Sequence, residues 1–321
     1  MGEIASIRQI NMPSPIVLFV YKRPDLTLKT LSALQNNDLA PSSKLFIFAD
    51  GPKTNSSEND LKDIERTRRI IKERTWCKES VIIENDHNLG LAKSVISGVT
   101  EVLRDFDRII VLEDDLVTAK GFLRYMNTGL DRYSDENRVM QLSGYNFPFK
   151  AKARGRSYFM PFTASWGWGT WKRAWDSFDE MATGYEELKS DSLLRDRFNL
   201  EGSYPYSDMM YNQMEKKIID SWAVRWWWSV FKQNGLVLYP DVTLIQNIGF
   251  GEGATHTNST VDFFNTDKFL SSYAINFFPD ELTVNEKAFS KVQEFISTKM
   301  NFRPSRNRNA FRNLVDKFRA L

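Results

Sequence analysis

The chain has 321 residues, 42% of them hydrophobic and 26% charged, which is typical of a globular protein with a sizeable core. Its single cysteine, Cys77, excludes an intrachain disulfide, and two histidines are too few for a Cys-rich or His-rich zinc site. The formal net charge of +2 predicts no nucleic-acid partner. No segment approaches the ~18 apolar residues that span a bilayer, and residues 1–15 lack an apolar signal region, so we expect a cytoplasmic protein.

Short apolar runs alternate with helical apolar stripes along the first 145 residues. Strands that alternate with helices predict βαβ units, and hence an α/β fold with a mostly parallel, Rossmann-like sheet flanked by helices. No Gly-rich phosphate loop is present, which is evidence against NAD-dependent enzymes and P-loop NTPases. The patterns predict strands at 15–21, 45–49, 81–83, 109–112 and 139–142, and helices at 24–34, 57–74, 90–103 and 119–132.

The second half has a different character, beginning with a run of glycine and tryptophan at 162–171. No low-complexity linker separates the halves, so we expect them to pack closely. We predict an N-terminal extension (1–14), a nucleotide-sugar-binding half (15–145), an acceptor-binding half (146–260) and a C-terminal extension (261–321). Further patterns predict helices at 171–175, 191–200, 206–219 and 222–235, strands at 236–239 and 242–245, and a flexible loop at 249–256.

Three acids, Glu113-Asp114-Asp115, directly follow the predicted strand at 109–112. Because burying unpaired charge is costly, we expect them at the carboxyl end of that strand, where open α/β sheets bind ligands. Adjacent carboxylates repel one another unless a cation lies among them. Their hard oxygen ligands suit Mg²⁺ or Mn²⁺ together with substrate phosphates. A solvated acidic turn before the next helix would have the same sequence.

Taken together, these segments resemble GT-A fold glycosyltransferases, and most closely the N-acetylglucosaminyltransferase I type, which has a Glu-Asp-Asp version of the acidic motif. Several bacterial polysaccharide glycosyltransferases are similar over the same span, roughly residues 14–256. The matching segments, in order, are Arg23-Pro24, Asp50, Glu113-Asp114-Asp115, Asp220-Ser221-Trp222, Tyr239-Pro240, Asn247-Ile248-Gly249-Phe250 and Gly253-Ala254-Thr255-His256.

The resemblance implies a role for each matched residue. Where the family has a histidine on the helix after the third strand, this chain has Ser94, and it lacks the disulfides and membrane anchor of secretory-pathway members, so we expect a bacterial relative. The implied roles are metal ligand for Asp115, ribose and donor-sugar contacts for Glu113 and Asp114, uracil contact for Asp50, nucleotide contact for Arg23, diphosphate contact for His256 and general base for Asp220.

Several of these residues have a second interpretation that the sequence leaves open. Asp220 or Ser221 could be an ordinary helix N-cap, and His256 could be a surface histidine. Trp166 and Trp168 could stack on the acceptor sugar or close the core between the halves. The three tryptophans at 226–228 span too wide a helical arc to face one ligand, so we expect at least one of them in the core.

The C-terminal segment 299–321 carries a net charge of +6, whereas the rest of the chain carries −4. From 307 to 321 its five large apolar residues share one helical face, and four basic residues surround them. Such a basic amphipathic helix indicates peripheral binding to an anionic membrane surface. A helix docked on its own domain, or a disordered tail, would show the same pattern.

The sequence thus predicts a metal-dependent, inverting glycosyltransferase. It would move a sugar from a UDP-sugar, such as UDP-GlcNAc, to a hydroxyl of a growing, lipid-linked surface glycan by single displacement. A divalent ion stabilises the diphosphate leaving group, and Asp220 accepts the acceptor proton. Two alternatives remain: a sugar-nucleotide pyrophosphorylase, which usually has a Gly-rich loop where this chain has residues 21–24, and a non-catalytic glycan-binding protein, which would not need four acids.

Overall fold

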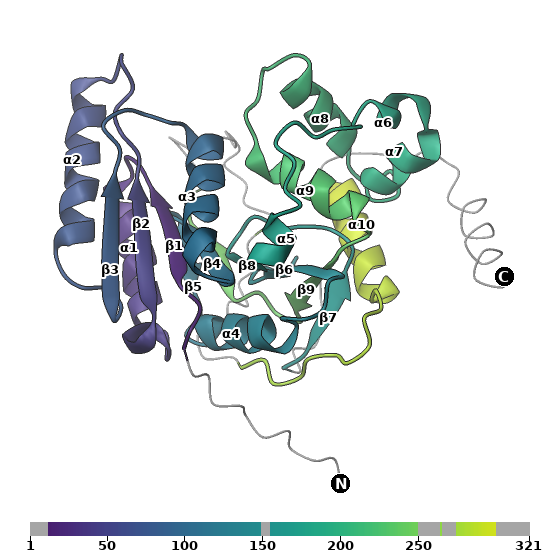
Figure 1. The fold of residues 1–321 in the computed structure, drawn as a ribbon, viewed down its shortest axis with the longest axis horizontal. Coiled ribbons are helices and arrows are strands. Elements are labelled where there is room, and N and C mark those ends of the chain that lie inside the picture. The colour runs from purple at the N-terminus through teal and green to yellow at the C-terminus, as the bar shows by residue number, and fades with distance from the viewer. Residues whose placement is uncertain (1–11, 149–154, 250–263, 265–273, 300–321) are drawn as a thin grey trace, which may run out of the picture.

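The computed structural model describes residues 12–148, 155–249, 264 and 274–299. Its centre is an eight-stranded sheet with the strand order β3-β2-β1-β4-β8-β6-β9-β7 (Figure 1). Six strands run in the same direction, and β7 and β8 run opposite to them. The predicted α/β fold with a mostly parallel sheet is therefore confirmed. The strands are β1 Ile16–Val20, β2 Lys44–Ala49, β3 Glu79–Glu84, β4 Arg108–Glu113, β6 Val139–Ser143, β7 Ser157–Met160, β8 Trp168–Trp171 and β9 Leu236–Pro240.

Helices pack on both faces of this sheet. The side chains of each strand alternate between the two faces, so both faces carry apolar side chains that the helices cover. Ile16, Leu18 and Val20 of β1 pack in the core layer that contains α1 and α4. Val17 and Phe19 point the other way, into the layer that contains α3, α5, α9 and α10. The helices are α1 Pro24–Gln35, α2 Glu58–Lys72, α3 Leu91–Asp105, α4 Phe122–Arg132, α5 Lys172–Trp175, α6 Glu187–Ser190, α7 Ser192–Phe198, α8 Tyr206–Met214, α9 Trp222–Lys232 and α10 Glu286–Lys299, with a short 3₁₀ turn at Ala40–Ser42.

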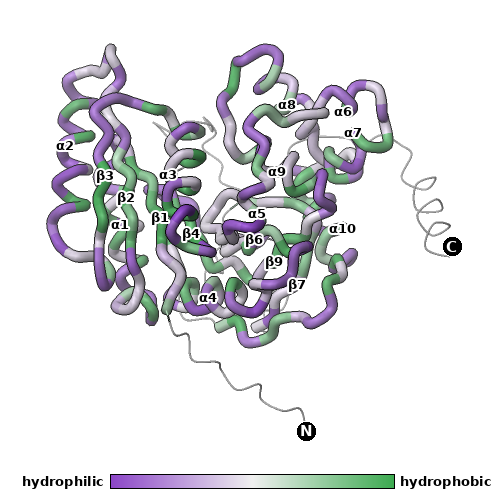
Figure 2. Tube along the Cα trace, viewed as in Figure 1, coloured by the Kyte–Doolittle hydropathy of each residue, from purple (hydrophilic) through white to green (hydrophobic). Residues whose placement is uncertain are grey.

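Local signals explain where several elements begin. Pro24 occupies the first turn of α1, and Ser57 caps α2 by accepting a hydrogen bond from the backbone N–H of Asp60. Gly90 precedes α3 with a φ of +80°, a conformation that glycine adopts without strain. In Figure 2 the hydrophobic colour is clear on strands β1 and β2, whereas hydrophilic colour dominates the outer helix α2.

The sheet continues from the predicted nucleotide half into the predicted acceptor half. Strand β8 pairs antiparallel with β4, placing Trp168 opposite Val111 and Trp171 opposite Arg108. The antiparallel pair of β5 (Leu116–Thr118) and β10 (Ile245–Asn247) ties the segment after the acidic run to the end of the predicted acceptor half. The two halves therefore share one core, and the four-part division stays a prediction.

Some boundaries differ from the sequence prediction. Helix α8 ends at Met214, not near 219, and the strand expected at 242–245 is instead β10, which begins at Ile245. The predicted His256 and the amphipathic segment 307–321 lie outside the described residues. In the part of the chain that the structure describes, no helix is both long and apolar enough to cross a membrane.

Candidate active site

Polar side chains gather where β1, β2 and β4 end at one edge of the sheet. Arg23 follows β1, Asp50 follows β2, and Glu113 is the last residue of β4. These strands are parallel, so their carboxyl ends meet at the same edge. The sequence-predicted candidates Arg23, Asp114 and Asp115 are brought into direct contact there.

One guanidinium holds two of the three acids of the acidic run. Arg23 Nη1 donates to Asp115 Oδ2 at 2.9 Å, and Arg23 Nη2 donates to Asp114 Oδ1. Asp114 is 3% exposed and Asp115 9% exposed, so both carboxylates are buried and rely on this partner. The Thr30 hydroxyl also donates to the backbone carbonyl of Asp114 at 2.9 Å, which fixes the turn after β4. The Arg23 guanidinium thus joins the segment after β1 to the segment after β4.

Three carboxylates share one guanidinium in this cluster, and the pKa values of Glu113 and Asp114 are raised. Burial raises the pKa of Glu113, the negative charges of Asp115 and Asp114 raise it further, and Arg23 opposes them. Burial and the charge of Asp115 likewise raise the pKa of Asp114, against the lowering effect of Arg23. If all three acids were ionised, the cluster with Arg23 would carry two negative charges. A further cation would therefore stabilise the ionised cluster.

The acidic run offers few side chains to a divalent ion. Across the described ranges, no three Asp, Glu, His or Cys side chains are arranged to enclose a metal. Asp115 nevertheless has one oxygen on Arg23 and no hydrogen bond among the described residues to the other. Mg²⁺ and related ions are commonly bound through one or two carboxylates and completed by substrate phosphates. The residues therefore fit an ion that arrives with a diphosphate and is held by Asp115, not a closed protein cage.

The segment after β10 lies directly against Asp115. The backbone N–H of Ile248 donates to the Asp115 carbonyl at 2.8 Å. A Cβ added at Gly249 would lie 2.1 Å from Asp115 Oδ2, so no larger residue fits there without moving the carboxylate. The Asn-Ile-Gly part of the predicted motif thus borders the acidic run, although its continuation to His256 lies outside the described residues.

Asp50 lies where the loop that leads into α3 binds both of its carboxylate oxygens. Its Oδ1 accepts from the backbone N–H groups of Gly51 and Leu89 at 2.9 and 2.8 Å. Its Oδ2 accepts from Asn88 Nδ2 at 2.8 Å and from the Gly90 N–H at 3.1 Å. A carboxylate offers about four lone-pair sites, and these four bonds use them. Asp50 therefore shapes the loop that leads into α3, and its contact with a uracil base stays a prediction.

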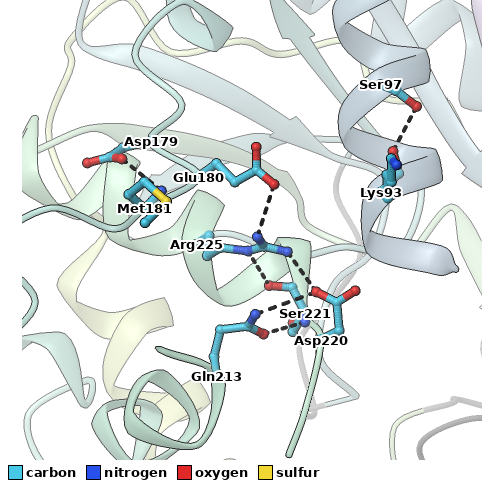
Figure 3. A network of polar contacts seen from close by, with 9 residues as sticks. All are labelled: Lys93, Ser97, Asp179, Glu180, Met181, Gln213, Asp220, Ser221 and Arg225. Carbon is cyan, nitrogen blue, oxygen red and sulfur yellow. Dashed lines mark hydrogen bonds and ion pairs between the residues drawn. The ribbon is translucent and has the colours of Figure 1, made fainter. Parts of the chain in front are cut away.

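Asp220 stands immediately before α9 but does not cap it, and its role as a general base stays a prediction. Ser221, not Asp220, is the N-cap, and its hydroxyl accepts from the Val224 N–H. The Asp220 side chain is 63% exposed, and its Oδ1 accepts from Arg225 Nη2 at 2.9 Å and Gln213 Nε2 at 3.5 Å (Figure 3). No hydrogen bond among the described residues engages Oδ2. Asp220 thus presents one held oxygen and one free oxygen.

Two stacked tryptophans connect the start of α9 with strand β8, the neighbour of β4 in the sheet. Trp222, two residues after Asp220, stacks on Trp168 with ring centroids 5.0 Å apart. Trp168 lies opposite Val111, two residues before Glu113. Helix α9 also packs against α3. The start of α9 is therefore connected through Trp222 and Trp168 to the carboxyl-terminal half of β4, which leads into the acidic run.

The tryptophans are mostly structural. Trp168 is 1% exposed inside the α9 layer, which agrees with the second interpretation, that it closes the core between the halves. Trp166 is half-buried against Tyr145, with ring centroids 4.7 Å apart, and stays a candidate acceptor contact. All three tryptophans of the run 226–228 are buried, where at least one was expected.

Sequence reasoning missed three residues around Asp220: Arg225, Gln213 and Glu180. One signal was available, because Arg225 is a charged residue within the otherwise apolar run 222–231, and a buried arginine needs an anionic partner. Asp220 lies five residues before it. Gln213 and Glu180 come from other elements, and nothing local in the sequence connects them with α9.

No model of a known protein family matches the chain, and no curated protein matches it. Among solved structures, it is similar to mannosyltransferase PcManGT from Pyrobaculum calidifontis, solved with GDP-Man and Mn²⁺ (12% identity, 48% of this chain and 40% of that one, TM-score 0.30). It is also similar to galactosyltransferase LgtC, solved with donor and acceptor sugar analogs (7%, 70% and 72%, TM-score 0.34), and to S. aureus TarS (13%, 44% and 24%, TM-score 0.27). The chain spans less than half of PcManGT and of TarS. Likenesses this distant do not identify a function, which has to be inferred from the residues of this chain.

Proposed function

We propose that this protein is an inverting glycosyltransferase that uses a UDP-sugar, such as UDP-GlcNAc, and a divalent ion. The observation that carries the proposal is the buried contact of Arg23 with Asp114 and Asp115 at the carboxyl edge of the sheet, and Asp220, just before α9, is the candidate base that accompanies it. The order of the motifs in the sequence, which resembles the N-acetylglucosaminyltransferase I type, supports the same conclusion. A glycan-binding protein would have no use for this concentration of buried carboxylates.

Each residue has a role that its surroundings permit. Asp115 would hold Mn²⁺ or Mg²⁺, which supplies Lewis-acid neutralisation of the diphosphate when bound. Arg23 positions the Asp115 carboxylate and, being only partly buried, also reaches the nucleotide side of the site. Glu113, at the strand end, is the candidate for the ribose or donor sugar, whereas Asp114 is buried enough to serve mainly as the counter-ion of Arg23.

The chemistry at Asp220 is a single displacement. The acceptor hydroxyl passes its proton to Asp220 Oδ2 while its oxygen forms a bond to the anomeric carbon of the donor. The bond from that carbon to the nucleoside diphosphate breaks, and its electron pair leaves with the diphosphate oxygen. Attack opposite the leaving group inverts the configuration. General-base assistance of this kind contributes about 10²- to 10⁴-fold to the rate.

The acceptor is a glycan hydroxyl, with Trp166 as the aromatic side chain best placed to contact it. We propose a lipid-linked, growing surface glycan, with the basic segment 307–321 bringing the enzyme to an anionic membrane. The four basic residues of that segment, which anionic lipid would attract, support this proposal.

The deciding experiment screens nucleotide sugars for metal-dependent hydrolysis and transfer, first with the native protein and then with Asp220→Asn. Since Ser221 caps α9, the asparagine removes the base without removing a cap. Donor binding by calorimetry should persist, and turnover should fall by about 10²- to 10⁴-fold. Asp191→Asn is the matched control, because Asp191 caps α7 and has no proposed chemical role. Near-native turnover of Asp220→Asn with intact donor binding would remove Asp220 from the mechanism.

A further inference from the structure

A buried arginine lies behind Asp220 (Figure 3). The side chain of Arg225 is 7% exposed, and its Nη2 donates to Asp220 Oδ1 at 2.9 Å. Its Nε donates to the backbone carbonyl of Ser221 at 3.1 Å, and its Nη1 faces Glu180 Oε1 at 3.6 Å. All three guanidinium nitrogens are directed at oxygen atoms. This is the planar fork that arginine, unlike lysine, can form.

The turn that carries Glu180 is fixed to the same helix as Arg225. The backbone N–H of Asp179 donates to the Ser229 hydroxyl at 3.0 Å. The Asp179 carboxylate accepts from the N–H groups of Met181 and Thr183 at 3.0 and 2.7 Å, which closes the turn. Glu180 therefore meets Arg225 because a closed turn is anchored on α9, and not only because two long side chains happen to reach each other.

Helix α8 supports the same carboxylate from another side. Gln213 Oε1 accepts from the Ser221 N–H at 2.6 Å, and its Nε2 lies 3.5 Å from Asp220 Oδ1. Both side-chain donors to Asp220 thus bind Oδ1. Oδ2 has no such bond among the described residues, and the side chain as a whole is 63% exposed. The network fixes which oxygen is available.

We propose that Arg225 and Glu180 are positioning residues for Asp220, an inference that depends on the proposed function. Arg225 holds Oδ1 so that Oδ2 faces the acceptor hydroxyl. Glu180 is the second anion on the same guanidinium. When Asp220 takes the acceptor proton, as the new bond to the anomeric carbon forms and the bond to the diphosphate breaks, Asp220 becomes neutral. Glu180 then remains to pair the buried charge of Arg225, which would otherwise be left uncompensated.

Two substitutions test the two residues. Arg225→Lys keeps the charge and loses the fork, and we expect kcat to fall by about 10- to 100-fold, as a misplaced catalytic group implies. Glu180→Gln lies at an exposed position and keeps the shape of the side chain. We expect it to lower kcat by about 10-fold, a part of what base catalysis contributes. In both variants the dissociation constant of the donor and the KM of the acceptor should change less than twofold, because neither residue touches either substrate.

The matched controls are Arg108→Lys and Asp131→Asn. They alter an arginine–carboxylate pair of 3.1 Å that begins at the opposite end of β4. If both test variants keep kcat within twofold of these controls while Asp220→Asn is inactive, the positioning role is wrong and the proposed function stands. If Arg225→Lys does not fold, judged by circular dichroism, Glu180→Gln decides alone by the same criterion. If the native protein consumes no nucleotide sugar, the proposed function fails and this inference fails with it.

Discussion

Gly249→Ala tests whether the position of the Asp115 carboxylate, and not only its charge, controls activity. A methyl carbon at 249 would lie 2.1 Å from Asp115 Oδ2, 2.8 Å from its Cγ and 2.9 Å from its Cβ. Ordinary contacts begin at 3.4 Å, so the oxygen must move by about 1.3 Å. Because the Asp115 Cβ is also too close, rotation of the side chain cannot relieve the overlap, and the turn after β4 must shift.

Two opposing effects set the change that we expect in the free energy of unfolding of Gly249→Ala. Gly249 is not among the glycines with positive φ, so alanine is compatible with its backbone and would by itself add about 0.4–1 kcal/mol to the free energy of unfolding. Overpacking costs about 1–3 kcal/mol. We expect a net loss of roughly 1–2 kcal/mol in stability. A displacement of about 1 Å at a reacting group costs on the order of 100-fold in rate, so we expect that loss in kcat/KM.

The assays are urea unfolding and metal-dependent turnover of the nucleotide sugar. In a double-mutant cycle with Asp115→Ala, the stability losses should be less than additive, because removing the carboxylate removes most of the overlap. Activity should stay lost in the double variant. Native activity in Gly249→Ala, or additive stability losses in the cycle, would refute the proposed link between position and function.

Three further outcomes are expected. The pKa of Glu113 is raised from 4.5 to about 8, so the fold without bound metal loses stability as pH rises from 4.5 to 8. Mn²⁺ should therefore raise Tm more at pH 8 than at pH 5.5. Equal increases in Tm at the two pH values would contradict this. Burial raises the pKa of Cys77 to about 12, so iodoacetamide at pH 8 should label it only after unfolding, which mass spectrometry checks. A chain ending at Phe302 should stay in the supernatant with anionic vesicles at low salt, whereas the whole chain co-sediments; equal sedimentation would make the segment 307–321 structural.

The N-terminal half of the fold could be predicted from local signals. The strands β1, β2 and β4 are continuous apolar runs, as expected of strands buried on both faces, and Ser57 and Pro24 mark helix starts. Strands β7 and β8 were missed for a physical reason. The segment Trp168–Trp171 has no local strand pattern and becomes a strand through its partners β4 and β6.

The candidate site was likewise predictable from the sequence only in part. The acidic run was visible because three acids directly follow an apolar strand. Its partner Arg23 is 92 residues from Asp115, and only the family resemblance brought the two together. The hydrogen bonds of Asp50 with the loop at 88–90 were not predictable, since two of them come from backbone N–H groups, which nearly every residue carries, and the third comes from Asn88, 38 residues away. Burial of Trp168 was likewise decided by packing between distant elements.

Two arginines of the candidate site each compensate the charge of a pair of carboxylates. Each guanidinium binds two carboxylates, Arg23 those of Asp114 and Asp115 and Arg225 those of Asp220 and Glu180. A bidentate fork suits this task, and lysine offers only a point charge. The two replacements should nevertheless affect different steps.

Because the proposed function assigns Arg23 to the donor side, Arg23→Lys should raise the dissociation constant of the UDP-sugar by about 10-fold, one broken charged contact. Its kcat at saturating donor should stay within about threefold of native, since lysine keeps a positive charge beside Asp115 and Asp220 is untouched. Arg225→Lys should show the reverse, with unchanged donor binding and reduced kcat. Calorimetry with the UDP-sugar and steady-state kinetics separate the two. If both variants lose donor binding equally, the donor and base sides of the site are not divided between the two arginines as their contacts indicate.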